Sequence, residues 1–132
     1  MKEPQNIVEF KTMVGRILGQ LYSEHPIEID RDAGTFFGNE VLDDQESDLF
    51  DSTVSYLVRS GYIHQDKQFY LQLTDTAWEV LQKPNPLQDT KSIGETLYEW
   101  MKETGQDTAK DGIKSLVPVA LTALYKAITA AG

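Results

Sequence analysis

The first segment of the chain has apolar residues at helical spacing. They are three or four positions apart, which places them on one face of a helix. These residues are Ile7, Phe10, Val14, Ile17, Leu18 and Leu21. The pattern predicts a helix over residues 7–22, ended by Pro26. Gly15 and Gly19 would weaken this helix, so we expect another backbone to approach it closely there.

A short strand and a capped helix are predicted next. Residues 27–30 alternate apolar and acidic side chains, which is typical of a short half-buried strand. Asp43 and Glu46 have the spacing of a capping box, which predicts a helix over residues 43–60. Gly61 follows and supplies the left-handed residue that commonly ends a helix. The predicted buried stripe of this helix is Phe50, Val54, Leu57 and Val58.

Residues 62–73 have the pattern of a hairpin made of two short strands. A polar turn separates the strands, and alternation along the second strand places Phe69, Leu71 and Leu73 on one face. Thr74 then stands at the cap position of a third helix, because its hydroxyl can accept a hydrogen bond from the first turn. Thr74 is therefore predicted to open a helix that ends near Lys83.

A proline-rich stretch separates this part of the chain from two further helical segments. The stretch begins with Pro84-Asn85-Pro86, which indicates a linker. Helical spacing returns beyond it, and the last segment spans residues 107–131. Pro118 should kink that helix or mark its start. The predicted organisation is a domain over residues 1–83, a linker over 84–91 and a C-terminal helical extension over 92–132.

The order of the predicted elements resembles that of winged-helix domains. The strongest local likeness lies in Leu57-Val58-Arg59-Ser60-Gly61-Tyr62-Ile63 and Tyr70-Leu71-Gln72-Leu73-Thr74-Asp75. These stretches are similar to the end of the third helix, the wing and the capping threonine of that family. The likeness covers about residues 6–82.

The resemblance implies an α+β, mainly α fold. It would comprise a winged helix-like domain of three to four helices with a small antiparallel wing sheet, followed by the C-terminal helical extension. More loosely, the chain resembles small uncharacterised bacterial winged-helix-like proteins with a helical tail, from which no activity can be carried over. Ala77 departs from many of these relatives, which have glycine there. The expected core residues are Leu57, Tyr62, Ile63, Leu73 and Trp78.

The composition fits one domain of ordinary size. Hydrophobic residues make up 40% of the 132 residues, which is enough for a buried core. The chain has no cysteine, which excludes disulfides, zinc–thiolate sites and cysteine nucleophiles. Its start lacks the apolar run of a signal peptide, so we expect a cytoplasmic protein. Residues 115–132 are too short for a bilayer span and contain Lys126, which argues against a membrane segment.

The net charge of −9 is concentrated in one part of the chain. Residues 24–51 contain ten acids and a single base, Arg31, and so account for the whole net charge. The acids are Glu24, Glu28, Asp30, Asp32, Glu40, Asp43, Asp44, Glu46, Asp48 and Asp51. The rest of the chain is neutral, so the sequence predicts a balanced surface with one acidic block.

The acidic block argues against DNA binding, which many winged-helix proteins perform. Such binding needs basic side chains on the recognition helix and the wing, because they neutralise phosphates. The helix in the recognition position begins with acids and has only Arg59 near its far end. The wing offers Lys67 and His64 alone. Nucleic acid is therefore not the expected partner.

Metal binding and catalysis have little support in the sequence. Residues 30–34 faintly resemble the start of a calcium loop, but the twelfth position is Val41, so the bidentate carboxylate is missing. A solvated acidic surface explains the same residues, since helix-start carboxylates complement the helix dipole. Neither His25 nor His64 lies beside a nucleophile motif. We therefore expect no metal, no cofactor and no enzymatic activity.

The sequence favours a protein-interaction module of unknown process whose partner has a basic surface. The predicted contact residues are Asp43, Asp44, Glu46, Asp48 and Asp51. The alternative is a DNA-binding transcriptional regulator that dimerises through its C-terminal helices. Those helices can pack back on their own domain, pair with a second chain as a homodimer, or lie on a membrane. Membrane contact is the least favoured, because the few lysines of the tail are offset by acids.

Overall fold

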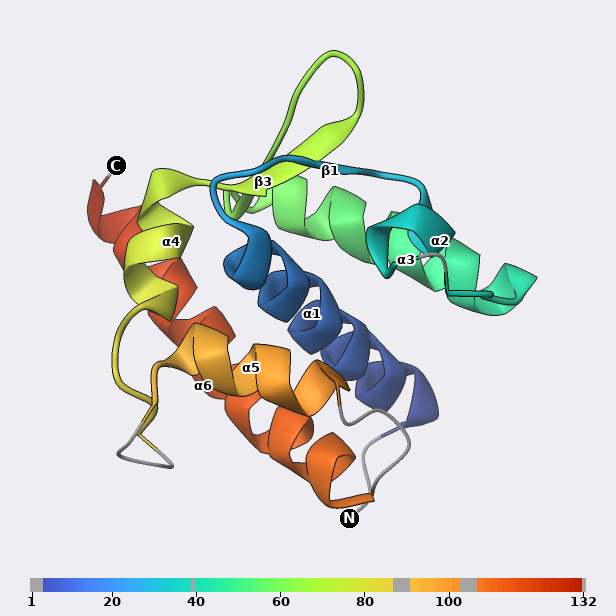
Figure 1. Cartoon of the computed structure of the whole chain (residues 1–132). Coiled ribbons are helices and arrows are strands. Elements are labelled where there is room, and N and C mark those ends of the chain that lie inside the picture. The colour runs from blue at the N-terminus through green and yellow to red at the C-terminus, as the bar shows by residue number, and fades with distance from the viewer. Residues whose placement is uncertain (1–3, 39, 87–90, 103–106, 132) are drawn as a thin grey trace.

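The structure is a computed structural model that describes residues 4–38, 40–86, 91–102 and 107–131 (Figure 1). The side chains of residues 107–114 and 131 are outside this description. The elements are α1 (Gln5–Glu24), β1 (Ile29–Asp30), α2 (Ala33–Phe36), α3 (Asp44–Arg59), β2 (Ile63–Gln65), β3 (Tyr70–Leu73), α4 (Asp75–Leu81), α5 (Ile93–Lys102) and α6 (Asp107–Ala131). The fold is mainly helical with one small sheet, as expected.

The three strands form an antiparallel sheet in the order β1-β3-β2. Ile29 of β1 pairs with Leu71, and Ile63 of β2 pairs with Leu73, so β3 lies between the other two strands. β2 and β3 form a hairpin that projects from the helices at the top of Figure 1. The sheet therefore joins residues next to α1 to the hairpin that follows α3.

The predicted helix signals occur where the sequence places them. The Asp43 carboxylate accepts a hydrogen bond from the Glu46 backbone, and the Glu46 side chain accepts one from the Asp43 backbone, which completes the capping box. Gly61 has φ of 83° and ends α3. The Thr74 hydroxyl accepts a hydrogen bond from the backbone of Ala77 and starts α4. All three predictions are confirmed.

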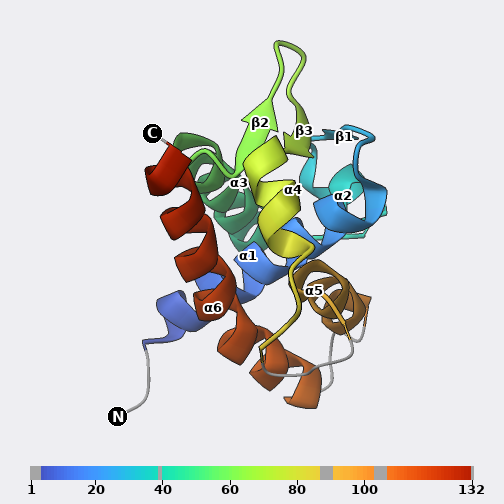
Figure 2. The ribbon, with the colours of Figure 1, turned by 90° about the vertical axis from the view of Figure 1, so that its left-hand side faces the viewer.

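The C-terminal helices pack on the chain's own N-terminal half. α5 packs closely on α1, and α6 contacts α1, α4 and α5; Figure 2 shows α5 end-on, near the chain segment that leads into α6. Between α4 and α5, Asn85 is buried and its backbone N–H donates to the Lys91 carbonyl oxygen. Residues 87–90 of the predicted linker lie outside the described residues. Pro118 lies inside α6, so it does not mark the start of that helix.

Close packing of α1 against α5 explains two glycines. A β-carbon added at Gly19 of α1 would lie 2.9 Å from the carbonyl carbon of Leu97 and 2.9 Å from the amide nitrogen of Tyr98. A β-carbon added at Gly94 of α5 would lie 2.3 Å from the ring of Tyr22. Each helix thus lacks a side chain where the other approaches. The close approach expected at Gly19 is confirmed, and its partner is the backbone of α5.

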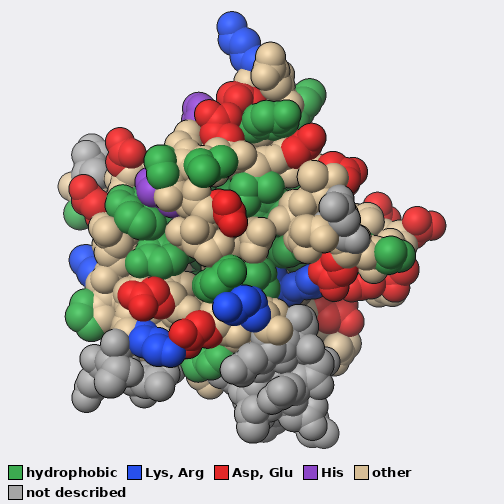
Figure 3. All heavy atoms as spheres, in the orientation of Figure 1, with side chains coloured by type: hydrophobic (Ala, Val, Ile, Leu, Met, Phe, Trp, Pro, Cys, Tyr) green, Lys and Arg blue, Asp and Glu red, His purple; other side chains and the backbone are tan. Residues whose placement is uncertain are grey.

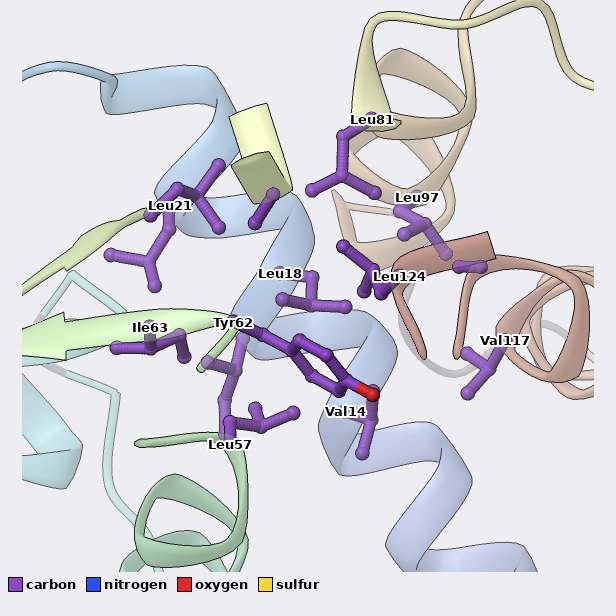
Figure 4. Close-up of a cluster of buried hydrophobic side chains, with 14 of the residues drawn as sticks. Val14, Leu18, Leu21, Leu57, Tyr62, Ile63, Leu81, Leu97, Val117 and Leu124 are labelled. Carbon is purple, nitrogen blue, oxygen red and sulfur yellow. The ribbon is translucent and has the colours of Figure 1, made fainter. Parts of the chain in front are cut away.

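One core runs through all the main helices (Figure 4). Side chains of α1 lie at its centre, between α3 and the hairpin on one side and α5 and α6 on the other. Leu18, Leu57, Leu97 and Leu124 are fully buried although they come from four different helices. The core expected from the sequence is found, with Leu57, Tyr62, Ile63 and Leu73 buried and Trp78 half-buried against it.

Two apolar residues at strand ends are exposed and depart from the alternation predicted for their strands. Phe69 is 60% exposed and has φ of 66°, because its backbone N–H closes the hairpin turn onto the Asp66 carbonyl oxygen. That left-handed conformation removes Phe69 from the alternation that buries Leu71 and Leu73. Ile27 is 66% exposed because it precedes the β1 ladder, which contains only Ile29 and Asp30. Both predictions from alternation were wrong at the ends of strands.

Replacing Gly19 by alanine should destabilise the protein by about 2 kcal/mol, because the added methyl group overpacks against the backbone of α5. Without the contact, replacing glycine by alanine would stabilise a helix by about 1 kcal/mol. A loss of stability would therefore indicate the contact between Gly19 and α5. Urea unfolding followed by circular dichroism measures it. Ser23→Ala, at an exposed position of the same helix, is the control and should be nearly neutral. A Gly19→Ala variant as stable as the parent protein would contradict this packing.

Candidate functional site

Three of the predicted contact acids form one stripe on α3. Asp44, Asp48 and Asp51 are four and three positions apart, so they lie on the same side of the helix. All three are exposed. In Figure 3 acidic side chains gather at the edge of the molecule where Figure 1 shows α3 beginning. We call Asp44, Asp48 and Asp51 the acidic stripe.

The other two predicted acids have a structural task. The Asp43 carboxylate accepts a hydrogen bond of 2.8 Å from the Glu46 backbone, and Glu46 accepts one of 3.3 Å from the Asp43 backbone. They start α3 on the side that faces α1, away from the acidic stripe. The structure thus divides the five acids between two sides of one helix.

Asp51 is the one member of the acidic stripe that faces a base. The Arg31 Nε lies 3.9 Å from the Asp51 carboxylate. The same guanidinium donates to the Asp51 carbonyl oxygen at 3.0 Å, to the Ser55 hydroxyl at 2.9 Å and to the Gln65 side chain. Arg31 therefore links the segment after β1 to α3 and to the hairpin.

Asp44 and Asp48 are without such a partner. Within the described part of the chain, neither carboxylate has a hydrogen bond or an ion pair. Both are exposed, so their charges are solvated and open to a partner. The described residues therefore leave the charges of Asp44 and Asp48 without a neutralising partner.

A second base near the acidic block, Arg16, has a buried side chain. The Arg16 side chain is 9% exposed, forms an ion pair with Glu40 and lies over the ring of Phe37, 4.2 Å from its centroid. A buried guanidinium needs a carboxylate beside it, so Glu40 serves the fold. The Nε atom of Arg16 is buried and has no hydrogen-bond partner among the described residues. Sequence reasoning missed this pair; its only signal was a lone base within a run of apolar residues and glycines.

A groove lies between α1 and the start of α3. Its volume is about 390 Å³. Val8, Met13 and Leu49 give it an apolar lining, and Glu9, Asp43 and Glu46 give it carboxylates. The remaining lining residues are Gln5, Thr12, Arg16 and Gln45. No local sequence signal indicates this groove, because it depends on how two helices diverge that are separated by residues 25–43.

Two other acids meet where the hairpin turn begins. The pKa of Glu28 is raised above its ordinary value, first because its protonated carboxyl can hydrogen-bond to Asp66, with burial and the Asp66 charge acting in the same direction. The backbone N–H groups of Tyr70 and Gln68 each donate to Asp66 at 2.9 Å. The Tyr70 hydrogen bond is the main reason that the pKa of Asp66 is lowered.

The bases available to nucleic acid are few on this side of the molecule. Arg59, His64 and Lys67 are exposed at the end of α3 and on the hairpin, whereas Arg31 is engaged as described. His25 stacks on Trp78 with ring centroids 4.2 Å apart, so it packs rather than lining a pocket. The described residues include no group of three or more His, Asp or Glu side chains arranged to hold a metal ion.

Comparisons with known proteins give no relative. No protein-family model matches the chain, and no curated protein or solved structure is significantly similar to it. None of the helices, over the residues described, has the length and apolar character needed to cross a bilayer.

Replacing Asp43 by alanine should lower the free energy of unfolding by about 1 kcal/mol, because α3 loses its cap. Asp48→Ala should change it by less than about 0.5 kcal/mol, since that carboxylate is exposed and without a partner. Thermal or urea unfolding of the two variants measures the difference. Equal losses for both would show that the assignment of Asp43 to the fold and of Asp48 to the surface is wrong.

Proposed function

We propose that this chain is a non-enzymatic protein-interaction module that binds a basic surface of a partner protein through the start of α3. The observation that carries the proposal is that Asp44 and Asp48 are exposed, on one side of a helix, without a neutralising partner in the described chain. The other predicted contact acids, Asp43, Glu46 and Asp51, extend the same negative region although they also stabilise the fold.

Electrostatics supports such a partner. Charges of one sign that are concentrated on a surface steer a complementary protein and fix its orientation. The bases of the same region, Arg16 and Arg31, are held by Glu40 and by Asp51 with its neighbours. They therefore reduce the negative field without presenting a positive patch of their own.

We further propose that residues 6–82 form a winged-helix domain. The element order α1, β1, α2, α3, β2, β3 and the sheet order β1-β3-β2 are compatible with that arrangement. In it α3 would occupy the recognition position and the hairpin would be the wing. The acids at the start of α3 would then lie on the surface with which other winged helices bind DNA.

DNA binding through α3 is the disfavoured alternative, because carboxylates at the start of the helix would repel phosphates. A mobility-shift assay with duplex DNA fragments should give no retarded band at physiological salt. A retarded band that weakens with added salt and is lost in an Arg59→Ala variant would favour the regulator instead.

Self-association through the C-terminal helices and a cytoplasmic location stay predictions. Tyr125 of α6 is 63% exposed, so one apolar position of that helix is open to solvent. The packing of α5 and α6 on α1 supports the ordinary alternative, in which these helices complete their own domain.

The main test is a charge-reversal pair. The variant Asp44→Lys/Asp48→Lys should reduce capture of basic proteins from lysate of the native cells by roughly tenfold, because attraction becomes repulsion. Captured proteins are identified by mass spectrometry, and the titration is repeated with the purified, most enriched protein.

Asp75→Lys/Glu79→Lys is the matched control. These acids are exposed and have the same spacing on α4, with Asp75 in the first turn as Asp44 is in α3. The two variants therefore have the same net charge and a similar change near a helix start. Capture should survive in the control. Equal losses of capture in both variants would show that capture depends only on the net charge of the protein. Undiminished capture by the α3 variant would refute the proposal.

A further inference from the structure

The groove between α1 and α3 combines an apolar floor with an acidic rim. On α1, residues Val8, Thr12 and Arg16 are four apart and line one wall together with Glu9 and Met13. On the other side the wall is formed by the capping box and by Gln45 and Leu49 of the first turns of α3. Met13 is buried, whereas Val8 and Leu49 are half-buried, so apolar surface is open within the groove.

The open charge in the groove is negative. Arg16 is its one base, and that guanidinium is already paired with Glu40 and stacked over Phe37. Glu9 accepts a hydrogen bond of 3.2 Å from the Gln5 side chain but has no ion pair among the described residues. Glu46 adds a second carboxylate from the opposite wall. A cation is therefore complementary to the rim, while an anion is not.

We propose that this groove holds a lysine or arginine side chain of the basic partner. The aliphatic stem would pack on Val8, Met13 and Leu49, and the charged end would lie between Glu9 and Glu46. Long basic side chains bury their stems on apolar surface in this way and keep the charge at a polar edge. The inference rests on the proposed function and names the chemistry of the contact.

The size of the groove agrees with a peptide-borne side chain. A volume of about 390 Å³ is at the low end of ligand pockets, which suits one side chain with its backbone rather than a large cofactor.

The test uses a defined probe. N-acetyl-lysine methylamide carries the ammonium, the stem and two amide carbonyls; N-acetyl-norleucine methylamide has a similar stem without the charge. Each is titrated into the ¹⁵N-labelled protein at constant ionic strength, and amide chemical shifts are followed. The lysine probe should move the signals of Val8, Thr12, Gln45 and Leu49, and the norleucine probe should leave them nearly unchanged. The arginine analogue then ranks the two basic side chains.

Two conservative variants locate the charge. Glu9→Gln and Glu46→Gln should each weaken binding of the lysine probe about threefold to fivefold, the range of a solvent-accessible ion pair. Glutamine at position 46 can still complete the capping box, so α3 stays formed. Asp75→Asn/Glu79→Asn removes two exposed charges outside the groove and is the control; binding should then fall by less than about twofold. Dispersed amide spectra establish that each variant is folded.

The outcomes separate this inference from the proposed function. Localised shifts that weaken in Glu9→Gln and Glu46→Gln but persist in the control support the groove. Shifts absent with the lysine probe, or equally weakened in all variants, overturn it. If the groove fails while reversal of Asp44 and Asp48 still abolishes capture, the acidic stripe acts without an anchor. If the groove binds while capture is unaffected by the reversal, the groove is a site and the proposed contact face is wrong.

Discussion

Helices α1 and α5 approach so closely that neither has room for a side chain at the contact, and the rest of the fold depends on this approach. Gly19 faces the backbone of Leu97 and Tyr98, and Gly94 faces the ring of Tyr22. α1 is thereby buried along one side by α5 and α6 and along the other by α3 and the sheet. Near the start of α1, Gln5, Val8, Glu9 and Thr12 stay accessible and line the groove.

This arrangement separates the structural acids from the available ones. Because α3 must begin next to α1, its cap residues Asp43 and Glu46 point to the groove side, where they hold the helix start. Asp44 and Asp48 are on the opposite side, and their carboxylates make no hydrogen bond or ion pair with the described residues. The single base of the acidic block, Arg31, is used to fasten α3 to the hairpin. A negative surface on a firmly held helix is the result.

Local signals in the sequence predicted most of the elements, because caps and helix ends act over only a few residues. The Asp43–Glu46 box, Gly61 and Thr74 are of this kind. Alternation failed at Phe69 and Ile27, where strands end and a turn decides the direction of the side chain. The distribution of acids along the chain indicated α3 as the candidate contact helix.

The remainder could not be predicted because it depends on contacts between distant segments. The Arg16–Glu40 ion pair, the Arg31–Gln65 hydrogen bond and the groove each bring together residues that are far apart in the sequence. The sequence also left open where the C-terminal helices pack. The periodicity of the C-terminal helices does not say whether they cover α1 or a second chain. The close approach of α5 at Gly19 identifies α1 as the surface that is covered.

The central claim is that α1 joins the hairpin side and the C-terminal helices into one cooperative unit. The two tryptophans allow a direct measurement, since Trp78 lies on α4 beside Tyr22 and His25, and Trp100 lies on α5. Urea unfolding is followed by fluorescence in the single-tryptophan variants Trp78→Phe and Trp100→Phe, with circular dichroism on the same samples. For each variant, the fluorescence transition should coincide with its circular dichroism transition, as a two-state domain requires. A Trp100 signal that changes well before the helical signal of the same variant would mean that α5 detaches independently, which would contradict the account.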